Sequence, residues 1–76
     1  MKEGTVVNIN KQEGVICSID EIDGIKYVNV AFDNNIYNIY RLEKDNGEDY
    51  LVLETNKEIV GNLLSKYLND YLKENA

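Results

Sequence analysis

The stretch TNKEIVGNLLSKYLNDYL, residues 55–72, changes the hydrophobic period of the chain and decides its fold. Thr55 and Glu58 have the spacing of a capping box, in which the Thr hydroxyl accepts a hydrogen bond from the N3 amide and the Glu side chain reaches back to the cap. Apolar residues then recur at helical spacing, and they are Ile59, Val60, Leu63, Leu64, Tyr67, Leu68, Tyr71 and Leu72. We therefore expect a helix over residues 56–74 whose apolar stripe is buried internally against a sheet.

The residues before this helix alternate short β-type runs with turn signals, which is the spacing of an antiparallel meander. Five strands are expected, over residues 5–10, 15–19, 25–32, 36–42 and 50–54. Asp33-Asn34-Asn35 tolerates left-handed turn geometry, and Asn46-Gly47 is a strong hairpin signal. The expected fold class is α+β, with residues 1–76 in one domain: a five-stranded antiparallel meander or small SH3-like or OB-like barrel with one C-terminal helix packed on it.

Composition narrows the classes of function. Fourteen Asp and Glu residues against eight Lys and Arg give a net charge of -6, which repels phosphate backbones and favours a basic protein surface as partner. The chain has no His, the usual general base, so we expect no enzyme, no cofactor and no metal. Its one cysteine, Cys17, alternates in register with Val15 and Ile19, so we expect a buried thiol.

The expected location is the bacterial cytoplasm. The N-terminus has no signal-peptide pattern, and no apolar run approaches the ~20 residues needed to cross a bilayer. Abundant Asn, Ile and Tyr, with no Trp or Pro, form the bias of AT-rich codons. This bias points to a low-GC bacterium, one of its phages or a mobile element.

Carboxylates gather at two of the expected turns. The expected contact residues are Asp20, Glu21 and Asp23 at one turn and Glu43, Asp45, Glu48 and Asp49 at the other. Consecutive hairpins place alternate turns at the same end of a meander, so the two groups can form one negative surface that docks on a basic groove. The competing interpretation is that the turns are solvated and their charge only keeps the protein soluble.

Tyrosines are the candidate anchors of the same surface. If Val28 and Val30 face the helix, strand alternation puts Tyr27 on the opposite face, where Tyr40 can join it. Tyr37 completes the set of expected anchors, because tyrosine combines a large rigid contact area with a polar tip. The competing interpretation is that a tightly curved barrel buries part of this face.

Several segments carry a resemblance to known sequences. They are DGIKYV at residues 23–28, IYNIYRLE at 36–43, NGEDYL at 46–51 and the acidic lead into the terminal helix. In this order of features, from about Val15 to Glu74, the chain resembles a family of small acidic proteins of unknown function from low-GC Gram-positive bacteria. The resemblance implies a β-meander with a helix and no activity.

The leading hypothesis is a non-enzymatic interaction protein that occupies the surface of another protein. Its most concrete version is a phage or mobile-element inhibitor, of the anti-CRISPR or anti-restriction type, that blocks a nucleic-acid-handling host defence protein. The alternative is a housekeeping bacterial SH3-like or OB-like domain that binds nucleic acid or a ribosome-associated factor through its tyrosines. The chain is either a monomer or a homodimer formed through the tyrosines or an exposed part of the helix.

Overall fold

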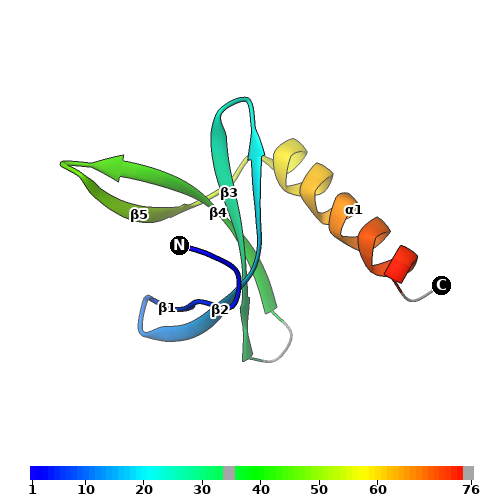
Figure 1. Ribbon diagram of the computed structural model, residues 1–76, viewed down its shortest axis with the longest axis horizontal. Coiled ribbons are helices and arrows are strands. Elements are labelled where there is room, and N and C mark those ends of the chain that lie inside the picture. Colours follow the sequence, from blue (N-terminus) through cyan, green and yellow to red (C-terminus); the bar gives the residue numbers. More distant parts are fainter. Residues whose placement is uncertain (34–35, 75–76) are drawn as a thin grey trace.

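The computed structural model describes residues 1–33 and 36–74, and in that part of the chain five strands precede one helix (Figure 1). The elements are β1 (Val6–Ile9), β2 (Gln12–Ile22), β3 (Ile25–Phe32), β4 (Ile36–Asp45), β5 (Glu48–Leu53) and α1 (Lys57–Glu74). The strands are antiparallel and lie in the order β1-β2-β3-β4-β5, so the predicted α+β meander is confirmed. β2 and β4 are longer than predicted.

The sheet curls into a half-barrel, with β1 and β5 as its two edges. Within the described residues no ladder joins β1 to β5, so the barrel stays open there. A groove of about 460 Å³ separates the two edge strands and is lined by Val7 and Ile9 from one side and by Tyr50 and Leu51 from the other. In Figure 1 the β1–β2 and β4–β5 hairpins lean to the same side, which is the inner side of the curl.

The main hydrophobic core fills the inside of the half-barrel. Its buried members are Ile16, Val28, Val30, Phe32 and Tyr40. β2 approaches this core most closely at Gly14, where an added Cβ would lie 2.6 Å from Cγ1 of Val30. A side chain at this position would overlap those of Val30 and Phe32, so glycine allows the backbone of β2 to lie close to the core.

A β-bulge in β2 reverses which residues face the core. Ile16 pairs with Val30, but the register shifts between Ile16 and Ser18, and Ile19 then pairs with Val28. Both Ile16 and Ile19 therefore contact the inner core, although three positions separate them. Cys17 lies at the bulge, between the paired residues Ile16 and Ser18, and it is exposed, so the prediction of a buried thiol is wrong.

The helix α1 packs on the outer face of the half-barrel, seen to the right of the sheet in Figure 1. Leu63 is buried against Tyr27 and Ile39, and the half-buried Ile59 and Tyr67 pack around them. The sequence left open which face of the sheet the helix covers, and Val28 and Val30 face away from it. The helix covers the face of β3 that carries Tyr27, because the face that carries Val28 and Val30 is already buried inside the curled sheet.

Only half of the predicted helix stripe is buried. Ile59, Val60, Leu63 and Tyr67 contact the sheet, but Leu64, Leu68, Tyr71 and Leu72 have exposed fractions of 45%, 58%, 60% and 54%. The prediction that the whole stripe is used internally is therefore wrong. Among the described residues, no helix combines the length and the apolar character needed to span a membrane.

The helix begins one residue later than the predicted capping box implies. Asn56 Oδ1 accepts hydrogen bonds from the amides of Glu58 at 3.0 Å and Ile59 at 3.3 Å, so Asn56 is the N-cap. Thr55 precedes the cap and is exposed.

Candidate functional site

The β4–β5 hairpin projects from the body of the protein and carries the densest group of carboxylates (Figure 1). Asn46 and Gly47 form its turn, with φ angles of 52° and 81°. Two central residues with positive φ are the signature of a type I′ turn, whose twist matches that of the flanking strands. The strands therefore continue to Asp45 and Glu48, and the turn predicted over residues 43–49 is reduced to two residues.

Two carboxylates at the tip of this hairpin face each other. Asp45 and Glu48 are directly paired across the strands, both are exposed, and neither makes an ion pair with another described residue. Like charges directly opposite one another in an antiparallel pair destabilise it. The tip of the hairpin therefore holds two adjacent, uncompensated negative charges, and we call Asp45 and Glu48 the acidic tip.

The other two carboxylates of the predicted group are paired with cations. Glu43 Oε1 accepts a hydrogen bond of 3.1 Å from Arg41 Nε, and Asp49 lies 3.9 Å from Lys44 Nζ. Both ion pairs are partly or largely exposed, so each contributes little to stability. These two ion pairs balance the charges of Glu43 and Asp49, so the net negative charge of the hairpin lies at Asp45 and Glu48.

Arg41 also joins the hairpin to the start of the helix. Its Nη1 donates a hydrogen bond of 2.9 Å to Oε2 of Glu54, whose side chain is almost fully buried. The amide of Asn56 donates to Oε1 of the same carboxylate at 3.1 Å. The hydrogen bond from the Asn56 amide, helped by the Arg41 guanidinium, outweighs burial and lowers the pKa of Glu54. The hydrogen bonds to Glu43 and, to a smaller extent, to Glu54 raise the pKa of Arg41.

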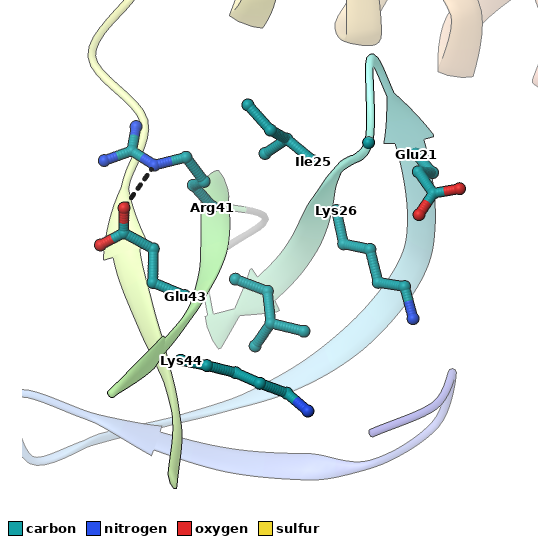
Figure 2. A pocket seen from close by; sticks show the side chains of 8 residues that line it. Glu21, Ile25, Lys26, Arg41, Glu43 and Lys44 are labelled. Carbon is teal, nitrogen blue, oxygen red and sulfur yellow. Dashed lines mark hydrogen bonds and ion pairs between the residues drawn. The ribbon is translucent and has the colours of Figure 1, made fainter. Parts of the chain in front are cut away.

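A pocket of about 380 Å³ opens where β3 and β4 separate (Figure 2). The pairing of β3 with β4 ends at Tyr27 and Arg41, after which β4 continues with β5 alone. The residues lining the pocket are Glu21, Gly24, Ile25, Lys26, Arg41, Leu42, Glu43 and Lys44. In Figure 2 Arg41 turns back to Glu43 on one side of the pocket, Glu21 and Lys26 lie on the other side, and Lys44 runs along the bottom of the view.

Asp20 lies under α1, and its carboxylate binds two side chains of the helix. Tyr67 Oη donates a hydrogen bond of 2.8 Å to its Oδ2, and Lys66 Nζ pairs with its Oδ1. Partial burial alone would raise the pKa of Asp20, but the hydrogen bonds from Lys66 and Tyr67 outweigh burial and lower the pKa. Burial, with the Asp20 carboxylate nearby, raises the pKa of Tyr67 to about 12.

The remaining residues of the first acidic group lie near the β2–β3 turn. Glu21 is exposed and directly opposite Lys26, and Asp23 is exposed in the turn. The structure brings Glu21 and Glu43 to one pocket but keeps the β2–β3 turn apart from the acidic tip, because β4 diverges from β3 (Figure 1). One residue of each predicted acidic group therefore lines this pocket, and a single binding surface built from both groups stays a prediction.

The predicted tyrosine face does not exist. Tyr27 and Tyr40 are only 3% and 6% exposed, and they are buried in the two opposite cores of the sheet. Tyr37 is 52% exposed and is the one predicted anchor that is open to a partner. The expected exposure of Tyr27 and Tyr40 is wrong because both faces of β3 and β4 are covered, one by the curl and the other by the helix.

Sequence reasoning missed the polar contacts around the helix, which are made by Arg41, Glu54, Asn56, Lys66 and the hydroxyl of Tyr67. Asn56 was identifiable, since Asn is a preferred N-cap. The contacts of Lys66 and Tyr67 with Asp20 depend on the bulge, for which the sequence has no clear signal. In residues 1–33 and 36–74, no three His, Cys, Asp or Glu side chains are grouped to hold a metal ion.

Comparison of the chain with protein-family models, with curated proteins and with solved structures gives no match. The resemblance to small acidic proteins of low-GC Gram-positive bacteria therefore stays a prediction.

Proposed function

We propose that this protein is a non-enzymatic interaction module that binds a basic surface of another protein with the acidic tip. The observation that carries the proposal is the direct pairing of Asp45 with Glu48 across an exposed hairpin. This pair costs stability in the free protein. A Lys or Arg side chain placed between the two carboxylates by a partner would relieve that repulsion.

The shape of the hairpin supports this role. The type I′ turn and the long β4–β5 ladder hold the two carboxylates on a regular, projecting element, so little ordering is needed on binding. The net charge of -6 adds long-range attraction toward a basic partner and increases the rate of encounter.

The concrete version of this proposal is a phage or mobile-element inhibitor of a host defence protein that handles nucleic acid. Such a protein has a basic groove for a phosphate backbone, and a projecting acidic hairpin can occupy that groove. The small size, the acidic composition and the amino-acid bias expected from AT-rich codons support this version. The alternative of nucleic-acid binding through a tyrosine face has less support, because Tyr27 and Tyr40 are buried.

The test is affinity capture from nuclease-treated bacterial lysate with the wild-type chain and with the D45K/E48K variant. Retention of a basic protein by the wild type, with loss in the variant, would support the proposal. Equal retention by both proteins would count against it. Capture that disappears on nuclease treatment, together with salt-sensitive binding of oligonucleotides by the wild type, would favour the nucleic-acid alternative.

A further inference from the structure

The edge of β1 points backbone groups into the groove that separates it from β5. The amide of Ile16 donates a hydrogen bond of 2.9 Å to the carbonyl of Thr5, so the backbone of Thr5 faces β2. The register of β1 with β2 continues without a bulge to Ile9, and successive residues of an antiparallel pair alternate between facing the partner strand and facing away. The N–H and C=O groups of Val6 and Asn8 therefore face away from β2, and Asn8 lines the groove.

The edge of β5 presents backbone groups from the opposite side of the groove. The amide of Glu54 donates a hydrogen bond of 2.9 Å to the carbonyl of Ile39, so the backbone of Glu54 faces β4. The register of β4 with β5 is regular, so alternation turns the N–H and C=O groups of Asp49, Leu51 and Leu53 away from β4. In residues 1–33 and 36–74, no ladder uses the outward groups of either edge strand.

The two edge strands run in the same direction. The ladders that lead from β1 through β2, β3 and β4 to β5 are all antiparallel, so the chain direction reverses at each of the four. Direct pairing of β1 with β5 would be parallel, which is slightly less stable per residue than antiparallel pairing. One strand of the opposite direction, placed between the edges, would instead form antiparallel ladders with both. The open side of the half-barrel therefore suits one added strand.

The groove has an apolar floor and edges with little protection against strand pairing. Val7, Ile9 and Leu51 line the groove, and each packs on the inner core while remaining partly exposed. Residues 6–9 and 50–53 include no charged residue and no proline. Soluble proteins usually protect exposed edges with such residues or with bulges, and the bulge described above lies in β2. Apolar side chains on an added strand would extend the inner core.

Charge favours a basic segment of another protein over a second copy of this chain. Among the described residues that line the groove, Asp49 has the one charged side chain, and its 3.9 Å contact with Lys44 is exposed. A Lys or Arg at this end would be attracted by Asp49 and by the acidic tip beside it. A second copy carries the same net charge of -6 and is repelled. Each of its edge strands is also paired with its own sheet on one side, so it cannot pair with both edges of the groove.

We propose that the groove between β1 and β5 binds an extended segment of another protein, which joins the sheet as a sixth strand antiparallel to both edges (Figure 1). The segment has apolar residues at alternate positions, facing the inner core. It has a Lys or Arg toward its C-terminal end, because a strand antiparallel to β5 ends beside Asp49. The outward edge from Asp49 to Leu53 is about 17 Å long at about 3.4 Å per residue. This site goes beyond the proposed function, since backbone and apolar contacts provide most of the binding.

The first test selects peptides from a random library displayed on phage, with the full chain as target. Enriched peptides are expected to carry apolar residues at every second position and a Lys or Arg toward the C-terminal end. Selection that enriches no peptide, or peptides without this pattern, would overturn the proposal.

The second test measures the affinity of an enriched peptide for two variants of one exposed residue by calorimetry. Asn8→Pro removes an outward-facing N–H and leaves the ladder with β2 intact, so binding should weaken at least about fivefold. Asn8→Ala is the matched control, because it loses the same side chain but keeps the amide, and it should bind like the wild type. Equal affinity of N8P and wild type, or equal weakening in N8A and N8P, would overturn the proposal.

Amide hydrogen exchange followed by NMR tests the same site without any substitution. Addition of the enriched peptide to the full chain should slow exchange at the outward-facing amides of Val6, Asn8, Leu51 and Leu53. Gly24, in the β2–β3 turn, is the control and should not change. Slowed exchange confined to other amides would overturn the proposal. Protection of the same amides in the protein alone, rising with concentration, would indicate a second copy and would also overturn it. None of these tests uses the partner of the acidic tip, so failure here leaves the proposed function standing.

Discussion

Tyr67 Oη donates a hydrogen bond of 2.8 Å to Asp20 Oδ2, and this contact ties α1 to β2. Asp20 faces the helix because the bulge at Cys17 shifts the alternation of β2 by one residue. In a regular strand, a residue four positions after Ile16 would face the inner core. The bulge therefore converts a carboxylate that could not be buried in the core into the polar attachment point of the helix.

Removing the hydroxyl of Tyr67 should destabilise the protein. Tyr67→Phe keeps the ring in its apolar contacts but loses the hydrogen bond to Asp20, so we expect a loss of about 1–2 kcal/mol in the free energy of unfolding. Denaturant titration measures this change. Tyr37→Phe, at an exposed tyrosine, is the control and should change stability little. Equal stability of Y67F and wild type would show that the hydrogen bond from Tyr67 to Asp20 contributes nothing to stability.

Stability should fall in acid through Asp20. The folded state lowers the pKa of this carboxyl below its usual 3.8, so the folded state binds the proton less readily than the unfolded state. The stabilisation is therefore complete above that usual value and is lost as the pH falls through the lower folded pKa. Unfolding free energy measured from neutral pH to pH ~2 should drop less steeply for Asp20→Asn than for wild type. Asp23→Asn, in the exposed turn, should follow the wild-type curve.

Gly14→Ala should disturb the inner core. The added methyl would lie 2.6 Å from Cγ1 of Val30 and 2.9 Å from Cε1 of Phe32. Overpacking of this kind costs about 1–3 kcal/mol, and the thermal midpoint should fall accordingly. Val15→Ala, at the exposed neighbour of Gly14, should remain within about 0.5 kcal/mol of wild type. An unchanged midpoint for G14A would mean that β2 can move away from the core without loss.

Reversing one charge of the acidic tip should stabilise the free protein. Glu48→Lys replaces the repulsion with Asp45 by an attraction across the hairpin, which is expected to add about 0.2–1 kcal/mol. Thermal unfolding at low salt measures the gain, and added salt should reduce it. Glu13→Lys, at an exposed site on β2, is the control for net charge. A destabilised E48K variant would show that Glu48 has a structural role.

The kind and order of the elements could be predicted from the sequence, because hydrophobic period and turn residues are local signals. Asn46-Gly47 gives the hairpin turn that its residues predict. The face that receives the helix could not be predicted. Val28 and Val30 on one side of β3 and Tyr27 on the other are all buried, so alternation alone does not distinguish the two faces.

The candidate site was predictable only in part. The acidic residues of the β4–β5 hairpin were identified, but their pairing with Arg41 and Lys44, which leaves Asp45 and Glu48 alone at the tip, depends on strand register. The apolar helix stripe was recognised as one surface. Its division into a half that contacts the sheet and an exposed half depends on where the sheet ends, which the helix sequence does not encode.

The most direct test of the proposed interaction is equilibrium binding of the purified basic partner to three forms of the chain at equal salt. The forms are wild type, D45K/E48K and the charge-matched control E3K/E13K, in which two exposed carboxylates elsewhere are reversed. We expect an affinity at least about tenfold weaker for D45K/E48K, near wild-type affinity for E3K/E13K and an unfolding midpoint of D45K/E48K close to that of wild type. Equal weakening in both variants would contradict the proposal, because net charge and not the acidic tip would then determine binding.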